Sequence, residues 1–228
     1  MKADHPTLLG IQARGSYETL TKSQKLLCDL FITHYAAYLA GQCPSALHVN
    51  LDGEGGTGKT HVIEFISVSL DEMWCNGPGN GQTIVQSPVL RCAPTGVAAH
   101  NISGKTLHSL FRIPVSKGEM ADLDTSALQS LQAIFAGVIY LIVDEKSMVS
   151  LSLLARIHKR CVKIFPRTAN LAFGGLNILL AGDFFQLPPV AARPLFSTKK
   201  SRIQDEIIGQ QYYKIFRHTI VLDVYCSS

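Results

Sequence analysis

The feature that most constrains this chain is a glycine-rich loop between an apolar segment and an amphipathic one. The loop occupies residues 53–60, reads GEGGTGKT, and satisfies the pattern GxxxxGK(S/T). Before it, residues 46–51 (ALHVNL) form a predicted strand, and after it the apolar residues of 62–70 recur with helical spacing. Strand, loop and helix in this order are the context in which the pattern is specific. The sequence therefore predicts a phosphate-binding loop.

Each part of this loop has a task in holding a nucleotide. Small residues let the backbone N–H groups wrap closely around the β- and γ-phosphates, because a Cβ would block the approach at several positions. Lys59 adds a positive charge at these phosphates, and Thr60 offers a hydroxyl to Mg²⁺. The N-terminus of the following helix directs its partial positive charge to the same point. The predicted binding residues are Gly53, Glu54, Gly55, Gly56, Thr57, Gly58, Lys59 and Thr60.

The rest of the chain predicts a single α/β domain. Its 228 residues are 46% apolar and 17% charged, which excludes a disordered chain, and its formal net charge of +4 permits contact with phosphates without requiring it. Further predicted strands lie at 89–93, 138–143 and 176–181. Predicted helices lie at 20–41, 97–101, 106–111, 127–135 and 151–165. Because strands alternate with helices, we expect a parallel sheet with helices on both faces, with a loose arm at 1–19 and a surface connection at 76–82.

The cysteines and the N-terminus bear on the compartment. The six cysteines have no CxxC spacing, since the closest pair lies 15 residues apart, so neither a metal site nor a redox pair is predicted. The first residues lack the pattern of a secretory signal, and no stretch approaches 18 apolar residues. We expect reduced thiols, an intracellular compartment and no membrane partner.

Two adjacent carboxylates, Asp144 and Glu145, follow the apolar run at 138–143. Ligands of open α/β sheets bind at the carboxyl ends of the strands, and the phosphate loop is expected at the same edge. Asp144 is therefore predicted to hold Mg²⁺ through water, and Glu145 to orient and deprotonate an attacking water. The alternative is that the pair merely begins a solvent-exposed loop.

The most specific stretch, ILLAGDFFQLPPV at 178–190, contains the third strand end. A buried strand ends at a glycine, and Gln186 then stands before a double proline that stiffens the loop. A neutral amide beside the γ-phosphate can donate to the phosphate or to the attacking water. Gln186 is thus a candidate catalytic and sensing residue, and a polar loop residue with satisfied hydrogen bonds is the alternative.

Four segments together resemble motifs of superfamily 1 helicases of the B branch: GEGGTGKT resembles motif I, CAPTGVAAHNISGKTLHSLF (92–111) motif Ia, LIVDEKSM (141–148) motif II, and AGDFFQLPPV (181–190) motif III. Within that branch the chain resembles the PIF (petite integration frequency) family of DNA helicases, including copies carried by Helitron-type transposable elements. The resemblance covers roughly residues 20–223. It implies a P-loop NTPase with a RecA-like parallel sheet and an ATP-dependent helicase that moves 5′ to 3′ on single-stranded DNA. It also implies duplex junctions as partners, roles in repair, recombination or telomere maintenance, and the nucleus or the mitochondrion as location.

Carried over position by position, the resemblance implies that ATP and Mg²⁺ are the cofactors. Lys59, Glu145 and Gln186 would act in catalysis, and Thr60 and Asp144 at the metal. A glutamine ahead of motif I contacts adenine in the family, and Gln24 matches it. Gln24 also fits a capping box with Thr21, in which it stands at the third helical position, and both roles can hold through different atoms.

The segments PTG and GKTLH match the single-strand-binding part of the family. Small residues and hydroxyls at a strand end allow a sugar–phosphate backbone to approach, and a lysine supplies charge. His108 or Phe111 can stack on a base, or pack a short helix against the sheet instead. The predicted DNA-binding residues are Pro94, Thr95, Gly96, Lys105, Thr106 and His108.

Two residues after the acidic pair keep two interpretations each. Lys146 either forms a local salt bridge or faces DNA. Ser147 either caps the helix that starts near residue 151 or has a functional role.

The chain departs from the family pattern after the strand expected at 220–224. In the family an Arg-Gln dipeptide opens a second lobe there, whereas this sequence continues as YCSS. We expect residues 20–228 to form the first RecA-like lobe, with the second lobe missing. Without an arginine from that lobe, the chain alone is expected to hydrolyse ATP poorly and not to unwind duplexes.

Two functions therefore stay open. The first is the ATPase lobe of a DNA helicase. The second is a truncated module that binds nucleotide and DNA without hydrolysis. A small-molecule P-loop kinase is remote, since GDFFQLPPV and the PTG segment have no task there.

Overall fold

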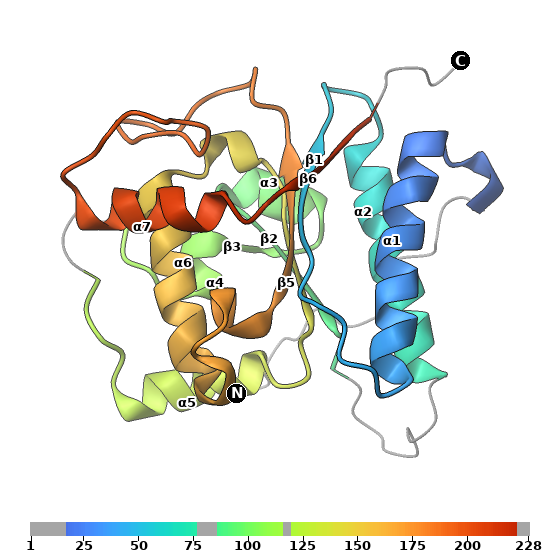
Figure 1. Cartoon of the computed structure of the whole chain (residues 1–228), viewed down its shortest axis with the longest axis horizontal. Helices are drawn as coiled ribbons and strands as arrows, with labels where there is room; N and C mark the ends of the chain where they lie inside the picture. The colour runs from blue at the N-terminus through green and yellow to red at the C-terminus, as the bar shows by residue number, and fades with distance from the viewer. Residues whose placement is uncertain (1–16, 77–85, 116–119, 223–228) are drawn as a thin grey trace.

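The structure, a computed structural model, describes residues 17–76, 86–115 and 120–222. Within these residues a six-stranded sheet has the order β3-β2-β4-β5-β1-β6, and every pair of neighbouring strands is parallel. All strands therefore end at one edge of the sheet, at the top of Figure 1. The strands are β1 (His48–Asp52), β2 (Val89–Ala93), β3 (Lys105–Thr106), β4 (Tyr140–Val143), β5 (Asn177–Gly182) and β6 (His218–Val221).

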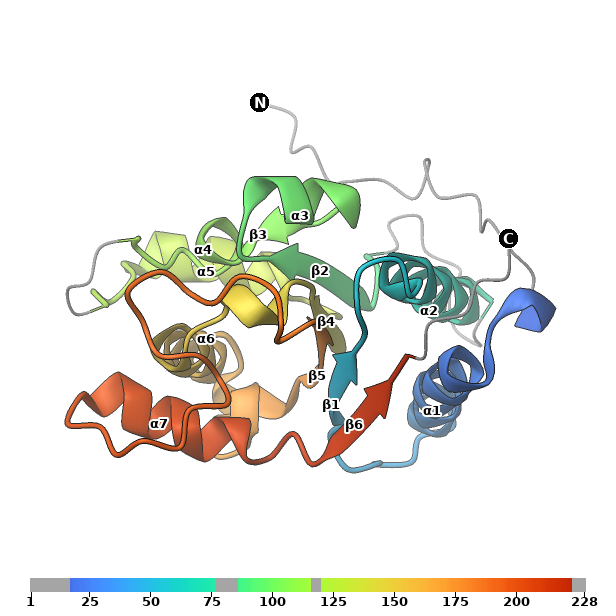
Figure 2. The same ribbon diagram turned by 90° about the horizontal axis from the view of Figure 1, so that it is seen from above.

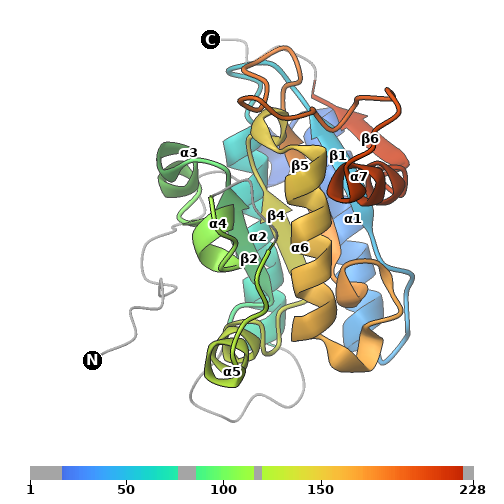
Figure 3. The same ribbon diagram turned by 90° about the vertical axis from the view of Figure 1, so that its left-hand side faces the viewer.

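Helices cover both faces of the sheet, as Figures 1 and 2 show, and this confirms the predicted α/β architecture. One face carries α1 (Lys22–Leu39) and α2 (Lys59–Cys75). The opposite face carries α5 (Thr125–Ile134), α6 (Leu151–Ile164) and α7 (Gln204–Tyr213), and Figure 3 shows α6 in front of the sheet. The short α3 (Gly96–Asn101) and α4 (Leu107–Leu110) follow β2 and β3. Four 3₁₀ helices complete the described elements: η1 (Tyr17–Thr19), η2 (Lys146–Met148), η3 (Pro166–Thr168) and η4 (Ala172–Gly175).

The central strands β4 and β5 contribute side chains to two separate hydrophobic cores, one on each face of the sheet. In β4, Tyr140 and Ile142 pack into the core under α1 and α2, whereas Leu141 and Val143 pack into the core under α5 and α6. Successive side chains of a strand point to opposite faces, so a strand covered on both faces must be apolar at every position. The uninterrupted apolar run in the sequence is a consequence of this double burial.

Several predicted boundaries differ from the structure, and one helix is new. Residues 17–19 of the expected arm form η1, held by the Tyr17 hydroxyl, which donates to Asp29 at 2.7 Å. The expected strand at 138–143 begins only at Tyr140. The helix expected at 127–135 begins at Thr125, because the Asp124 carboxylate accepts a hydrogen bond from the N–H of Ala127 and caps the helix. Residues 1–16, 77–82 of the expected connection, and 223–228 lie outside the described residues.

Helix α7 was not predicted, and β6 begins at His218 rather than at residue 220. The apolar residues of α7 are few and do not form a continuous stripe, so helical periodicity is weak there. Its Gly209 lies against α6, since a Cβ at this position would come within 2.0 Å of the Leu151 carbonyl oxygen. Close approach between two helices, rather than local pattern, fixes this element.

His158 of α6 joins α7 to η4. Its ring stacks on Tyr212 with centroids 3.6 Å apart, and its Nδ1 accepts a hydrogen bond from the N–H of Phe173 at 3.1 Å. Burial, and then the charge of Lys159, lower the pKa of His158 to about 4. The neutral ring is thus the form that the folded protein holds.

We expect acid to destabilise the fold between pH 6.5, the ordinary pKa of histidine, and pH 4, the lowered pKa of His158. An unfolded histidine binds a proton near pH 6.5, so the free energy of unfolding falls as the pH drops from 6.5 toward 4, by on the order of 2 kcal/mol for one such group. His158→Gln should reduce this pH slope, and His48, whose pKa burial also lowers to about 4, should account for part of the remainder. Urea unfolding at several pH values measures the slope. Equal slopes in wild type and variant would contradict the assignment.

Candidate active site

The phosphate loop joins β1 to α2 in the predicted order. Gly56 and Gly58 both have φ +82°, a left-handed conformation that side chains rarely adopt, and a Cβ on Gly53 would come within 2.5 Å of the Thr57 hydroxyl. Helix α2 has no side-chain cap at Gly58. Its first N–H groups therefore keep no side-chain partner at the cap, which is the arrangement that phosphate-binding helix N-termini require.

Lys59 lies over its own loop. Its Nζ donates to the carbonyl oxygen of Gly53 at 2.7 Å and to that of Glu54 at 2.9 Å. Thr60, the next residue, is exposed. The ammonium and the hydroxyl thus stand at the loop that the sequence assigned to phosphate and Mg²⁺.

Asp144 and Glu145 leave the end of β4 at the same edge of the sheet. The buried Asp144 carboxylate accepts a hydrogen bond from the N–H of Glu145 at 2.9 Å. Glu145 has φ 54° and ψ 47°, a left-handed conformation that is costly for a residue with a side chain and is often retained at functional sites.

The electrostatics link this acidic pair to the phosphate loop. Burial raises the pKa of Asp144 and of Glu145, and the charge of Asp144 raises the pKa of Glu145 further. The Lys59 ammonium lowers the pKa of both carboxyls, so it lies within electrostatic reach of both. The predicted catalytic lysine and both predicted carboxylates therefore lie at the same edge of the sheet, within electrostatic reach of one another.

These donors suit Mg²⁺ bound together with a nucleotide. Mg²⁺ takes one or two carboxylates together with phosphate oxygens and water, rather than a full cage of protein ligands. In the ranges that the structure describes, no three His, Cys, Asp or Glu side chains gather into a metal site of their own. Asp144 and the Thr60 hydroxyl would hold the ion, and its charge would offset the cost of burying the Asp144 carboxylate.

The third strand end places Gln186 on a turn. The N–H of Gln186 donates to the carbonyl oxygen of Asp183 at 3.1 Å, and the Asp183 carboxylate accepts from the N–H of Phe185 at 2.9 Å. The Gln186 side chain is exposed and forms no hydrogen bond with any other described residue. This does not support a locally satisfied loop residue, and the role at the γ-phosphate stays a prediction.

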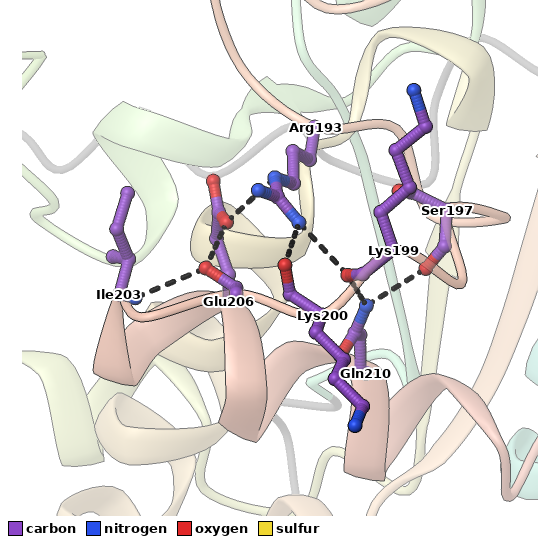
Figure 4. Close-up of polar contacts among 8 residues, drawn as sticks. Arg193, Ser197, Lys199, Lys200, Ile203, Glu206 and Gln210 are labelled. Carbon is purple, nitrogen blue, oxygen red and sulfur yellow. Dashed lines mark hydrogen bonds and ion pairs between the residues drawn. The ribbon is translucent and has the colours of Figure 1, made fainter.

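The loop that follows Gln186 is fixed at its far end to α7 (Figure 4). Arg193 forms an ion pair with Glu206 at 3.0 Å and donates to the carbonyl oxygens of Lys199 and Lys200. The Gln210 amide donates to two carbonyl oxygens of the same loop. The segment after β5 is therefore a held loop, which restricts where its first turn can lie.

Gln24 fulfils the capping box that the sequence offered as one of two roles. Its Oε1 accepts from the N–H of Thr21, and its own N–H donates to the Thr21 hydroxyl. Its Nε2 also donates to the carbonyl oxygen of Thr57 at 3.2 Å, which ties α1 to the phosphate loop. A contact with adenine stays a prediction.

The predicted DNA-binding segment lies at the ends of β2 and β3, with Lys105 and Gly96 exposed. The two threonine hydroxyls have structural partners, because Thr95 caps α3 and Thr106 caps α4. Val97, which sequence reasoning missed, is exposed beside Gly96 and offers apolar surface on this face.

The two aromatic candidates of this segment differ. Phe111 is fully buried and packs against Phe135 with ring centroids 5.3 Å apart, so the packing interpretation is confirmed and stacking on a base is wrong. His108 is half-buried, and burial followed by the charge of Arg156 lowers its pKa. Pro94 is also half-buried. Their contacts with DNA stay predictions.

The two interpretations of Lys146 and of Ser147 are resolved by their surroundings. The Lys146 side chain is fully buried and forms an ion pair with Asp52, so the interpretation that it faces DNA is wrong. Ser147 does not cap α6. That cap is Ser150, whose hydroxyl accepts from the N–H of Leu153 at 3.1 Å. The sequence did not identify Asp52 as the partner of Lys146. It also did not identify Ser150 as the cap, because Ser147 and Ser150 both stand shortly before the helix.

Comparison with known proteins gives one family. The family model described as PIF1-like helicase matches residues 19–223. Among curated relatives, the ATP-dependent DNA helicase PIF1 of Saccharomyces cerevisiae is 38% identical over 149 residues, which is 64% of this chain and 16% of that protein. The ATP-dependent DNA helicase PIF1 of Candida albicans is 29% identical over 209 residues, which is 83% of this chain and 22% of that protein.

Solved structures give the same fold. The Pif1 helicase from Candida albicans has a TM-score of 0.62 at 23% identity, over 90% of this chain and 40% of that one. The Pif1 from Bacteroides sp in complex with ADP-AlF4 has a TM-score of 0.60 at 25% identity, over 92% of this chain and 43% of that one. This chain thus spans about a fifth of the curated relatives and about two fifths of the solved chains. No helix among the described residues is long and apolar enough to span a membrane.

Proposed function

This chain belongs to the PIF1-like helicase family, and on that premise we propose that it is the first RecA-like motor lobe of an ATP-dependent DNA helicase, with ATP and Mg²⁺ as cofactors. The observation that carries the proposal is that the phosphate loop after β1 and the acidic pair after β4 leave parallel strands at one edge of the sheet. The charge of Lys59, which lowers the pKa of both carboxyls, is consistent with this placement. A phosphate loop alone would be compatible with many nucleotide-binding proteins. A phosphate loop with a buried carboxylate and a second, partly exposed carboxylate at the same sheet edge has the parts needed for phosphoryl transfer to water.

In this mechanism the phosphate loop binds and orients the triphosphate. Backbone N–H groups at the start of α2 donate to the phosphate oxygens, and the Lys59 ammonium moves from its own loop carbonyls to the β- and γ-phosphates. Mg²⁺, when bound, neutralises charge on the same phosphates. Lys59 thus exchanges two neutral acceptors for charged ones, which are the stronger partners.

Glu145 and Gln186 act on the water. Glu145 accepts the proton of the attacking water, and its raised pKa makes the carboxylate a stronger base than an exposed glutamate. Gln186 orients the same water or the γ-phosphate through its unengaged amide. Asp144 is more deeply buried and would hold the metal, and its backbone hydrogen bonds keep it at the strand end.

DNA is proposed to cross the ends of β2 and β3. A solved relative from Bacteroides is described as bound to single-stranded DNA, and another solved structure as two Pif1 helicases at forked double-stranded DNA. In this chain Lys105 supplies the exposed charge of that face, and exposed Gly96 leaves room for a sugar–phosphate backbone. Movement from 5′ to 3′, roles in repair, recombination or telomere maintenance, and a location in the nucleus or the mitochondrion rest on the family resemblance alone and stay predictions.

The test is phosphate release from ATP with and without single-stranded DNA, measured on this chain and on a version extended by a second RecA-like lobe, because the chain alone is expected to hydrolyse ATP poorly. We expect DNA to stimulate release, and we expect Lys105→Ala to weaken DNA binding and to reduce its salt dependence by about one phosphate contact. Lys163→Ala, an exposed cation at the far end of α6, is the matched control. If the extended version released phosphate no faster than its own Lys59→Ala variant, the second function, a module that binds without hydrolysis, would be favoured. Unaltered DNA binding by Lys105→Ala would remove this face from the interface.

A further inference from the structure

Lys146 connects three strand ends beneath the active site. It follows the acidic pair of β4, and its ammonium forms an ion pair with Asp52, the last residue of β1 and the neighbour of the phosphate loop. The same Nζ lies 4.7 Å from the centroid of the Phe184 ring, which comes from the segment after β5. One side chain thus contacts the segments that carry the phosphate loop, the acidic pair and Gln186.

The setting is costly for a lysine. The side chain is 0% exposed, whereas that of its partner Asp52 is 33% exposed. Burial lowers the pKa of Lys146, and the charge of Lys59 lowers it further. The hydrogen bond and charge of Asp52, and the charge of Asp183, raise it. Two apolar residues of similar volume would be as stable or more stable at such a place, so stability alone does not account for the pair.

The backbone around Lys146 is confined as well. A Cβ on Gly182 would come within 2.8 Å of the Lys146 backbone nitrogen, so β5 passes directly against this residue. The carbonyl oxygens of Glu145 and Lys146 accept the two hydrogen bonds of the η2 turn, from Met148 and Val149. Glu145, in its left-handed conformation, therefore stands immediately before an anchored residue.

We propose that Lys146 is a positioning residue of this ATPase, acting through its ion pair with Asp52. The pair holds the Glu145 carboxylate at a fixed place relative to the phosphate loop. It also neutralises Asp52, whose free carboxylate next to the loop would repel the triphosphate. The inference rests on the proposed function, since it assigns a role in the same site.

The first experiment tests the pair without nucleotide. Unfolding midpoints are compared for wild type, Asp52→Asn, Lys146→Met and the double variant. We expect Asp52→Asn to lower the midpoint more than Lys146→Met, because it leaves the fully buried charge unpaired, and we expect the double variant to recover most of the loss. If the midpoint shifts of Asp52→Asn and Lys146→Met simply added in the double variant, the two side chains would not be energetically coupled and the proposal would be wrong. Lys163→Met and Asp122→Asn, which break an exposed ion pair of the same type, are the control and should change the midpoint little.

The second experiment separates positioning from stability by steady-state ATP hydrolysis with single-stranded DNA, at temperatures well below every unfolding midpoint. Wild type and variants all carry the same added second RecA-like lobe, because the chain alone is expected to hydrolyse ATP poorly. We expect Lys146→Met to lower kcat by about 10- to 100-fold and to raise KM for ATP several-fold. In the double variant KM should return to within about twofold of wild type, because the free carboxylate is gone, whereas kcat should stay low. If Lys146→Met does not fold, the double variant, which buries no unpaired charge, decides the question through kcat.

The outcomes distinguish this inference from the proposed function. If wild type hydrolyses ATP, Lys59→Ala does not, and the double variant matches wild type in kcat, the positioning role is wrong and the ATPase stands. If wild type hydrolyses no more ATP than Lys59→Ala, the proposed function is wrong and the role of Lys146 falls with it.

Discussion

Replacing Lys59 with alanine is expected to abolish binding of Mg·ATP while the fold survives. The Lys59 ammonium lies over the phosphate loop, and charged hydrogen bonds contribute about 1.5 to 3 kcal/mol each. Two such bonds to phosphate would weaken binding by at least about 100-fold when lost. The fold should survive because the described bonds of Nζ go only to carbonyl oxygens of the loop, and none reaches the core.

Calorimetric titration with ATP and Mg²⁺ measures this effect, and the thermal midpoint reports on the fold. Lys163→Ala provides the matched control, because it removes a lysine in the last turn of α6, outside the predicted site. Equal affinities for wild type and Lys59→Ala would refute a nucleotide site at this loop. A midpoint lowered by many degrees would instead make Lys59 a structural residue.

The second large effect is expected at the acidic pair, where Glu145→Gln should bind nucleotide and lose hydrolysis. A general base contributes about 10²- to 10⁴-fold to the rate, and glutamine keeps the size of the side chain without its basicity. Asp144→Asn should act differently and weaken the Mg²⁺ dependence of binding, since Asp144 is the more deeply buried carboxylate and the one proposed to hold Mg²⁺. The two substitutions thus divide one pair of carboxylates into two tasks.

The stability of Glu145→Gln provides an internal control. Because burial and Asp144 raise the pKa of Glu145, the folded protein disfavours its charged form, so at neutral pH the uncharged variant should be at least as stable as wild type. Single-turnover phosphate release measures the chemical step, and a fluorescent nucleotide measures binding. Hydrolysis by Glu145→Gln at the wild-type rate would show that another group is the base.

The parts of the site that depend on neighbouring residues were predictable from the sequence. The phosphate loop is one continuous segment, and its glycines, Lys59 and Thr60 have places set by the strand before it and the helix after it. The Thr21–Gln24 capping box is equally local, because its partners lie within one helical turn. The apolar run of β4 indicated a strand with both faces covered, and the two cores confirm it.

The local sequence pattern could not decide between two interpretations when both of them fitted the same pattern. Ser147 and Ser150 both precede α6, and only the place where the η2 turn ends makes Ser150 the cap. Phe111 stands in a segment that resembles a DNA-binding motif, but its ring is taken up by the core beside Phe135. The weakly periodic α7 was missed because contact with α6, not its own pattern, defines it.

The sequence alone was therefore enough to identify the short segments proposed to carry the chemistry, together with the α/β class that brings the ends of the strands to one edge. Only the folded chain shows which of these ends are neighbours. The strand order β3-β2-β4-β5-β1-β6 does not follow the chain, so it places Asp52 of β1 and Lys146 after β4 on either side of β5. Spacing along a sequence records contacts within one element, whereas an ion pair between separate strand ends exists only once the sheet has assembled, and for this reason the role of Lys146 was open until the fold was known.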